Sequence, residues 1–238
     1  MARLPNRFPK VRAVYERDNN ENGRYTVNPV INKGFDWVFD NAEEVEAVEK
    51  IHGTNMSVRC KDGEVVEIAT RIGDRSMNKV NPYSDTESHY LVRGVQNSIR
   101  RGYIDQYEDG WVFGELVGPK VHGNPYDLEE HLFIPFDWLR DKCEYRSYGK
   151  YSTEFEDISN WLQNEIFSLF YSRMNGTDLS EASVSNGVFV EGIVFVHPNF
   201  NQSIHPNTLE TKRSDEYGSV TRTVGKLRRD MFDWYHDS

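Results

Sequence analysis

Short strand-like runs joined by turn-length links constrain the fold of this chain more than any other feature of its sequence. Residues 57–70 predict a β-hairpin, because two apolar runs flank Asp62-Gly63, a pair that favours the tight turn between antiparallel strands. Further strand-like runs occur at 111–117, 131–136, 188–196 and 220–227. We therefore expect a mixed α+β fold with largely antiparallel sheets flanked by helices.

Two segments predict helices. Residues 85–100 follow a capping-box pattern at Ser84 and Glu87, in which each side chain satisfies a backbone N–H at the start of a helix. Residues 154–174 carry apolar side chains at helical spacing and stop at an Asn-Gly pair, a common way to end a helix. We expect residues 1–238 to form a single domain in which residues 1–30 are loosely structured, because residues 18–29 are polar and rich in turn formers.

The charge balance excludes a general nucleic-acid binder, because the formal net charge is −10. Any contact with a polynucleotide would need a local basic patch. The candidates are Arg100-Arg101, Lys212-Arg213 and Arg228-Arg229, although solvated surface charge explains each pair equally well.

Cysteine usage and hydropathy indicate the compartment. The two cysteines, Cys60 and Cys143, lack zinc-finger spacing and suit a reducing cytosol. No apolar stretch approaches the roughly 20 residues that a membrane helix needs, and the N-terminus lacks the apolar core of a secretory signal. We therefore expect a soluble, cytoplasmic protein without membrane contact.

Residues 49–55 (E-K-I-H-G-T-N) indicate covalent nucleotidyl transfer. The alternation of side chains over 45–50 favours a strand that ends at Lys50, although the Glu and Ala content of 42–49 also fits a helix. A lysine amine can attack the α-phosphate of ATP and carry AMP as a phosphoramidate, because its surroundings can keep Lys neutral, unlike Arg. Gly53 would let the backbone pass close to a bound nucleotide.

Further segments supply, in chain order, what such an enzyme needs. Arg71 closes the predicted hairpin and is placed to reach a phosphate, Glu115 ends an apolar strand between two glycines, and Phe136 offers a ring that can stack on a base. Lys226 and Arg228 point to one face of a strand, because residues i and i+2 do. Each has an ordinary structural explanation when taken alone, and their joint order carries the prediction.

Glu191 is the most informative of these residues after Lys50. We expect it inside an otherwise apolar strand, where a carboxylate costs several kcal/mol unless it is paired or coordinates a metal. An internal salt bridge, for example to Lys226, is the alternative to a metal site.

The ordered set resembles motifs I, Ia, III, IIIa, IV and V of the covalent nucleotidyltransferase superfamily, which includes DNA ligases, RNA ligases and mRNA capping enzymes. Residues 49–55 and 112–119 (V-F-G-E-L-V-G-P) are most similar to the bacteriophage RNA ligase 2 type, which has His where DNA ligases and capping enzymes usually have Asp. The resemblance spans roughly residues 45–232 and implies an ATP-grasp-like nucleotidyltransferase domain.

The resemblance also implies a role for each residue. Lys50 would be the adenylated nucleophile, and Glu49 would hydrogen-bond the adenine amino group. Arg71 would bind a phosphate of the nucleotide or of the RNA 5′ end, and His52 would act near the phosphate or in the later RNA-joining steps. The remaining implied roles are ribose binding by Glu115, adenine stacking by Phe136, binding of the catalytic divalent cation by Glu191, and binding of the α-phosphate by Lys226 and Arg228, which would also favour the neutral amine of Lys50.

The implied activity is that of an ATP-dependent RNA ligase involved in RNA repair. Lys50 would be adenylated by ATP with Mg²⁺ or Mn²⁺, AMP would move to an RNA 5′-phosphate, and an RNA 3′-hydroxyl would displace AMP. A DNA ligase or another end-processing nucleotidyltransferase is one alternative, and a non-catalytic nucleotide or RNA-end binding protein is the other.

Two departures from the family pattern qualify the expectation. The second basic position of motif V is usually Lys but is Arg228 here, and Arg also binds phosphate well. Only a short segment follows Lys226, so we expect an adenylyltransferase domain without the C-terminal OB domain of DNA ligases and capping enzymes. A protein partner would then replace the missing C-terminal domain.

Overall fold

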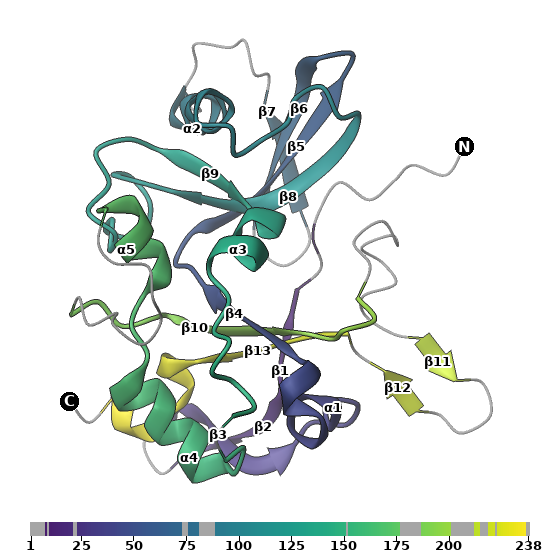
Figure 1. Cartoon of the computed structure of the whole chain (residues 1–238), viewed down its shortest axis with the longest axis vertical. Helices are drawn as coiled ribbons and strands as arrows, with labels where there is room; N and C mark the ends of the chain where they lie inside the picture. The colour runs from purple at the N-terminus through teal and green to yellow at the C-terminus, as the bar shows by residue number, and fades with distance from the viewer. Residues whose placement is uncertain are drawn as a thin grey trace. The chain divides into compact units, whose positions relative to one another are not determined.

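The computed structural model describes residues 8, 10–20, 23–72, 76–80, 89–150, 152–176, 187–200, 212–214, 219–221 and 223–236. The chain divides into two compact units (Figure 1). Unit 1 consists of Met1–Lys10 and His52–Asp141, and unit 2 consists of Val11–Ile51 and Lys142–Ser238. Among the described residues, none of the helices has the length and apolar character that crossing a lipid bilayer requires.

Unit 1 is built on a five-stranded antiparallel sheet with the strand order β7-β6-β5-β8-β9. The predicted hairpin is confirmed, and its turn has positive φ angles at Asp62 (53°) and Gly63 (79°), as the tight turn between antiparallel strands requires. The strands are β5 (Thr54–Lys61), β6 (Glu64–Ile72), β7 (Ser76–Val80), β8 (Gly110–Val117) and β9 (Leu132–Pro135).

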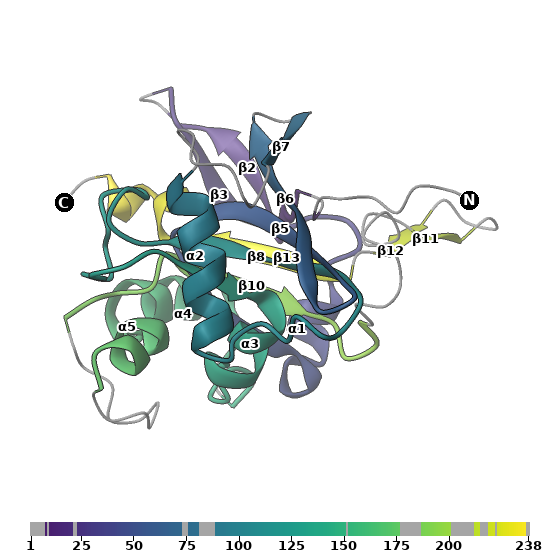
Figure 2. The ribbon, with the colours of Figure 1, turned by 90° about the horizontal axis from the view of Figure 1, so that it is seen from above.

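Helix α2 (His89–Arg100) covers one face of this sheet (Figures 1 and 2). Its apolar side chains Leu91, Val92 and Val95 share a buried cluster with residues of β5, β8 and β9. The helix predicted at 85–100 is thus confirmed from His89 onward, whereas its expected capping box lies outside the described residues. Helix α3 (Phe136–Lys142) follows β9 directly.

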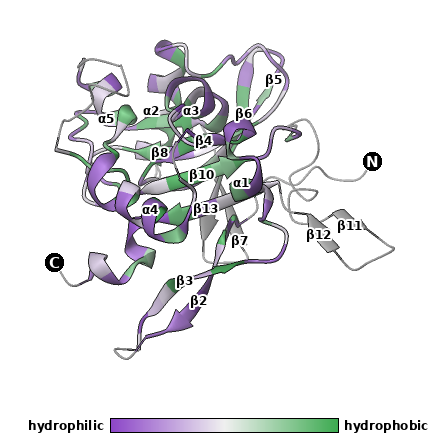
Figure 3. Ribbon diagram, turned by 60° about the horizontal axis from the view of Figure 1, so that its bottom comes forward, coloured by the Kyte–Doolittle hydropathy of each residue, from purple (hydrophilic) through white to green (hydrophobic). Residues whose placement is uncertain are grey.

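Unit 2 is built on a four-stranded sheet with the order β1-β13-β10-β4. All neighbouring strands are antiparallel except β1 and β13, which are parallel. Figure 3 shows that β10 is strongly hydrophobic, in keeping with its central place in the sheet. The strands are β1 (Arg12–Ala13), β4 (Glu46–Lys50), β10 (Gly192–Val196) and β13 (Val224–Arg228), with two separate pairs, β2 (Tyr15–Asn19) with β3 (Tyr25–Ile31) and β11 (Lys212–Ser214) with β12 (Ser219–Thr221).

Short helices and turns complete unit 2. They are α1 (Trp37–Asp40), α4 (Phe155–Asn160), α5 (Leu169–Met174), a π-helical turn at Trp161–Glu165, and 3₁₀ turns at Ala42–Glu44, Arg229–Met231 and Asp233–Tyr235. The strand that ends at Lys50 is confirmed, and the helical alternative for 42–49 survives only as the first of these 3₁₀ turns.

The structure corrects four expectations about segments. Residues 12–20 and 23–31 are not loosely structured, because Val14 and Tyr15 are buried and these residues contribute the strands β1, β2 and β3. The strand expected over 188–196 begins only at Gly192, and the run 220–227 is divided between β12 and β13. The helix expected over 154–174 is broken, for a reason that involves Glu49.

Candidate active site

Three strands of the four-stranded sheet bring Lys50, Gly192 and Arg228 into one row. Gly192 on β10 is opposite Lys50 on β4 and opposite Arg228 on β13. Residues directly opposite each other share a face of the sheet, so the two cationic side chains project from the same face, as does Lys226, two residues before Arg228. Only glycine fits between them, because a Cβ at Gly192 would lie 2.2 Å from the carbonyl oxygen of Leu227.

Glu191 immediately precedes β10 and makes an ion pair with Lys50. The Oε2 atom of Glu191 lies 2.7 Å from Nζ of Lys50, and its Oε1 atom lies 3.7 Å from Nη1 of Arg228. The side chains of Glu191 and Lys50 are only 16% and 21% exposed, so solvent screens their attraction incompletely. Glu191 therefore precedes the apolar strand rather than lying inside it, and its ion pairs are with Lys50 and Arg228, where a pair with Lys226 was the alternative.

The row and Glu191 together form a compact cluster of charge on one sheet face. Arg228 also pairs with a second carboxylate, since its Nε atom lies 3.1 Å from Oδ1 of Asp230. In such a cluster the carboxylate holds the amine in a defined position, and the neighbouring guanidinium supplies positive charge to a bound phosphate. The motif residues expected to act together in unit 2 are therefore brought together, apart from Glu49.

Glu49 projects to the opposite face of β4, because successive residues of a strand alternate. It is only 1% exposed. Its Oε1 atom accepts a hydrogen bond from the hydroxyl of Ser168 (2.5 Å), and its Oε2 atom accepts one from the backbone N–H of Phe170 (2.7 Å). Burial raises the pKa of Glu49 from 4.5 to about 7, although these hydrogen bonds oppose the rise. Its expected contact with adenine stays a prediction.

The same contacts explain the break in the helix predicted over 154–174. After the π-helical turn, Ile166 is extended, and Phe167 forms a β-bridge with Phe189. Ser168 then starts α5 as its N-cap and accepts a hydrogen bond from the N–H of Tyr171. The break presents the hydroxyl of Ser168 and the N–H groups at the start of α5, which have no partner within the helix, to the carboxylate of Glu49.

Arg229 is a site-supporting residue that the sequence did not reveal. Its backbone N–H donates to the carbonyl of Glu191 (3.0 Å). Its guanidinium carbon lies 4.3 Å from the ring centroid of Phe189 and 5.0 Å from that of Trp234. Its Nη1 atom donates to the carbonyl oxygens of two residues in the π-helical turn, Leu162 and Gln163. The only sequence signal was the Arg228-Arg229 pair, and the structure half-buries Arg229 instead of leaving it as solvated surface charge.

The other predicted site residues belong to unit 1. Arg71 lies in β6 opposite Met77. Glu115 lies in β8 and is half-buried. Phe136 is the first residue of α3, and its ring packs edge-on against Phe8 with a centroid distance of 4.8 Å. Their expected roles in binding phosphate, ribose and adenine stay predictions.

His52 is held by the link between β8 and β9, and Gly53 lies against β8 itself. The backbone N–H of His52 donates to the hydroxyl of Tyr126 at 2.6 Å, and its imidazole stacks on that of His122 with a centroid distance of 4.6 Å. A Cβ at Gly53 would lie 2.8 Å from both the Cβ of Glu115 and the carbonyl oxygen of Leu116. The close approach of β8 thus requires glycine at position 53, independently of any requirement that a bound nucleotide would impose.

Comparison with known proteins identifies the family. The family model described as RNA ligase matches residues 43–205, which is more than half of the chain. The chain belongs to the RNA ligase family. The matched region contains every predicted site residue except Lys226 and Arg228. No curated protein is similar enough in sequence to count as a match.

Solved structures similar to this chain include several of an RNA ligase from Naegleria gruberi. The form with PPi has a TM-score of 0.42 and 16% identity, covering 100% of this chain and 61% of that one. A mutant with AMP and Mn has a TM-score of 0.42 and 15% identity, with the same coverage. A mutant with ATP and Mn has a TM-score of 0.41 and 14% identity, covering 99% and 64%. The present chain thus spans about three fifths of the length of these ligases.

Proposed function

We propose that this chain is an ATP-dependent RNA ligase of the bacteriophage RNA ligase 2 type that forms a lysyl-AMP intermediate at Lys50. Membership of the RNA ligase family supports the proposal. The observation that carries it is the contact of Lys50 with Glu191 on a sheet face that also bears Arg228. A positioned amine among groups that can neutralise phosphate charge is what nucleotidyl transfer needs.

The reaction would run in three balanced steps. The ammonium of Lys50 first gives up one proton. Its neutral amine then attacks the α-phosphorus of ATP, so that a P–N bond forms, the bond to pyrophosphate breaks and the nitrogen releases a second proton. The RNA 5′-phosphate then attacks the same phosphorus, which breaks the P–N bond, and the leaving nitrogen takes up a proton to return the amine. Finally the RNA 3′-hydroxyl attacks the activated 5′-phosphate and gives up its proton, and AMP leaves as a phosphodiester forms.

The residues of unit 2 would act by holding and neutralising charge. Glu191 accepts a hydrogen bond from Nζ of Lys50 and so fixes the direction of the amine. Arg228 and Lys226, on the same sheet face, would bind the oxygens of the α-phosphate, where negative charge accumulates during transfer. The expected roles of Glu49, His52, Arg71, Glu115 and Phe136 complete the proposal.

The carboxylate of Glu191 fits a divalent cation that protein and substrate oxygens would bind jointly. Among the described residues, no three His, Cys, Asp or Glu side chains gather as a metal site. Mg²⁺, however, usually takes only one or two carboxylates and fills its other positions with water and phosphate oxygens. Glu191 would hold Mg²⁺ or Mn²⁺, which would supply positive charge to the phosphates of ATP.

Transfer of label from ATP tests the covalent step. The protein is incubated with α-³²P-labelled ATP and Mg²⁺ or Mn²⁺ and resolved on a denaturing gel. We expect a labelled protein band that is lost in Lys50→Ala and in Lys50→Arg and is kept in Lys61→Ala, which changes an exposed lysine. Folded protein that takes up no label, and that mass spectrometry shows is not already adenylated, would overturn the proposal in favour of a non-catalytic nucleotide-binding protein.

Sealing assays test the substrate class. Nicked duplexes that differ only in having RNA or DNA at the 3′-hydroxyl side separate an RNA ligase from a DNA ligase, because only an RNA ligase has reason to depend on the 2′-hydroxyl. We expect sealing of the RNA-ended nick to be faster. Equal or faster sealing of the DNA-ended nick would favour the DNA ligase alternative. The expected protein partner and cytoplasmic location stay predictions.

A further inference from the structure

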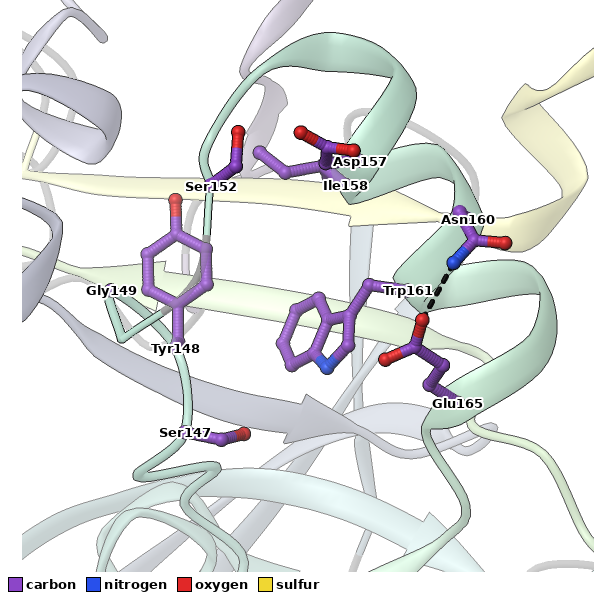
Figure 4. Close-up of a pocket in the computed structure, with 9 residues that line it drawn as sticks. All are labelled: Ser147, Tyr148, Gly149, Ser152, Asp157, Ile158, Asn160, Trp161 and Glu165. Carbon is purple, nitrogen blue, oxygen red and sulfur yellow. Dashed lines mark hydrogen bonds between the residues drawn. The ribbon is translucent and has the colours of Figure 1, made fainter.

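A pocket of about 280 Å³ opens in unit 2, and no residue of the proposed active site lines it (Figure 4). Two aromatic side chains form its wall. The ring of Tyr148 is buried, the indole of Trp161 is half-buried, and their centroids lie 5.7 Å apart with the planes inclined by 36°. The hydroxyl of Tyr148 donates to the carbonyl of Val38 at 2.8 Å. Tyr148 therefore offers the pocket mainly the apolar surface of its ring.

The polar lining of the pocket is acidic. Asp157 and Glu165 are exposed and line it, and none of the described residues in its lining is Lys, Arg or His. Figure 4 shows the carboxylate of Glu165 beside the indole of Trp161, with Asp157 on α4 at the other end of the pocket. The side-chain amide of Asn160 donates to Oε1 of Glu165 at 2.6 Å and holds it there. An anion such as a nucleotide phosphate would be repelled.

The backbone that carries Trp161 and Glu165 is wound in an unusual way. Residues Trp161–Glu165 form a π-helical turn, closed by a hydrogen bond from the N–H of Ile166 to the carbonyl of Trp161 at 3.2 Å. The wider π-helical turn brings residues four apart closer to one face than an α-helix does. π-Helical turns are rare and are found disproportionately at functional sites. Here the turn places the indole of Trp161 and the carboxylate of Glu165 in the same wall of the pocket.

We propose that this pocket binds an aliphatic polyamine. Its ammonium groups would pair with Asp157 and Glu165, and an ammonium over the indole face of Trp161 gains a cation–π interaction. The methylene segments between the charges would cover the rings of Tyr148 and Trp161. The volume lies just below the range of about 300–1,000 Å³ that is usual for small-molecule sites, which suits a slender chain and not a folded partner.

Titration with spermidine tests the proposal. The reporter is the indole N–H cross-peak of Trp161 in a ¹⁵N–¹H correlation spectrum, identified by its loss in Trp161→Phe. We expect a saturable shift in buffer whose ionic strength is held constant with NaCl. Asp157→Asn or Glu165→Gln should each raise the apparent Kd by roughly two- to fivefold, as the loss of one exposed ion pair predicts. Glu156→Gln is the matched control, because it removes the same charge from the same helix outside the pocket lining.

Three results would overturn the proposal. One is a shift that does not saturate or that is unchanged in both pocket variants, because the effect would then be general surface charge. Another is an equal weakening by Glu156→Gln. The third is tighter binding of a blocked lysine amide or of Mg²⁺ than of spermidine, which would assign the pocket to a protein side chain or to a metal ion. These readouts do not depend on ligase activity.

Discussion

Nζ of Lys50 lies 2.7 Å from Oε2 of Glu191, although 141 positions separate the two residues along the chain. The pairing of β4 with β10 brings them together, because Lys50 is opposite Gly192, the neighbour of Glu191. A carboxylate this close to the proposed nucleophile holds its nitrogen in place before ATP arrives. Strand pairing thus sets the direction of the amine, together with a local hydrogen bond from Nζ to the carbonyl of Ile51 at 3.3 Å.

Replacing Glu191 with Gln should abolish most of the adenylyl transfer. The change keeps the size of the side chain but removes the charge that holds Lys50 and pairs with Arg228. We expect the rate of covalent labelling by ATP to fall by about 10²-fold or more, in line with the loss of one well-positioned electrostatic group. Asp230→Asn is the control, since Asp230 pairs with Arg228 but not with Lys50 among the described contacts. Labelling of Glu191→Gln at the normal rate would contradict the role assigned to Glu191.

Replacing Glu49 with Gln should alter how stability depends on pH. Because the pKa of Glu49 is raised from 4.5 to about 7, the folded protein keeps a proton that the unfolded chain has lost between these values. The contribution of Glu49 to the free energy of unfolding is fully present below about pH 4.5 and is lost as the pH rises through about 7. The shift corresponds to about 3 kcal/mol. The amide of the Glu49→Gln variant cannot titrate, so the variant should gain stability relative to the native protein by up to that amount between pH 5 and pH 8.

Denaturant unfolding at these two pH values measures the effect of Glu49→Gln. The matched control is Glu43→Gln, which changes an exposed glutamate in the preceding turn. The same pH dependence in the native protein and in Glu49→Gln would show that the carboxyl of Glu49 does not titrate in this range.

Replacing Tyr126 with Phe should loosen the segment around His52. Tyr126 is 3% exposed, and its hydroxyl accepts the backbone N–H of His52. Removing that acceptor leaves a half-buried donor unsatisfied and should cost about 1–3 kcal/mol. We expect faster hydrogen exchange at the His52 amide and no such change in Tyr107→Phe, because Tyr107 is 78% exposed. An unchanged exchange rate in Tyr126→Phe would show that this hydrogen bond does not hold His52.

Replacing Arg229 with Lys should weaken both stability and adenylyl transfer. A lysine keeps the charge, but its ammonium is not planar. It cannot stack on the rings of Phe189 and Trp234 as a guanidinium does, or donate to two backbone carbonyls in the same geometry. We expect a loss of about 1–3 kcal/mol in unfolding free energy and slower labelling, because Arg229 also fixes the carbonyl of Glu191. Arg146→Lys, at an arginine that is 79% exposed, should change neither quantity. Normal labelling in a destabilised Arg229→Lys protein would limit Arg229 to a structural role.

The parts of the fold that depend only on residues adjacent in the sequence were predictable. The Asp62-Gly63 turn is one example, since two positive φ angles in succession are a property of that pair itself. The break between α4 and α5 was not predictable, because it depends on a hydrogen bond from Ser168 to Glu49, 119 positions away. The spacing of apolar residues predicts a continuous helix here, because it contains no information about a distant carboxylate that accepts hydrogen bonds from the N-terminus of a second helix.

The same distinction applies to the candidate site. Lys50, Glu191 and Arg228 were predicted from their residue types and order, and the sheet of unit 2 brings them together. Arg229 and Tyr126 were missed, because each acts through contacts with residues far away in the sequence. The basic pair Arg100-Arg101 also proved less available than its sequence suggests, since both guanidinium groups pair with Glu130.

The row formed by Lys50, Gly192 and Arg228 makes the spacing of the charges independent of the length of the chain between them. Backbone hydrogen bonds between strands fix the row, so residues can be added to or removed from the connecting segments without moving the two cations apart. A slip of β10 by a single residue would instead place Ile193 between them and drive a branched side chain into the space where only glycine fits. The spacing of the two cations therefore depends on strand register and not on the length of the connecting segments.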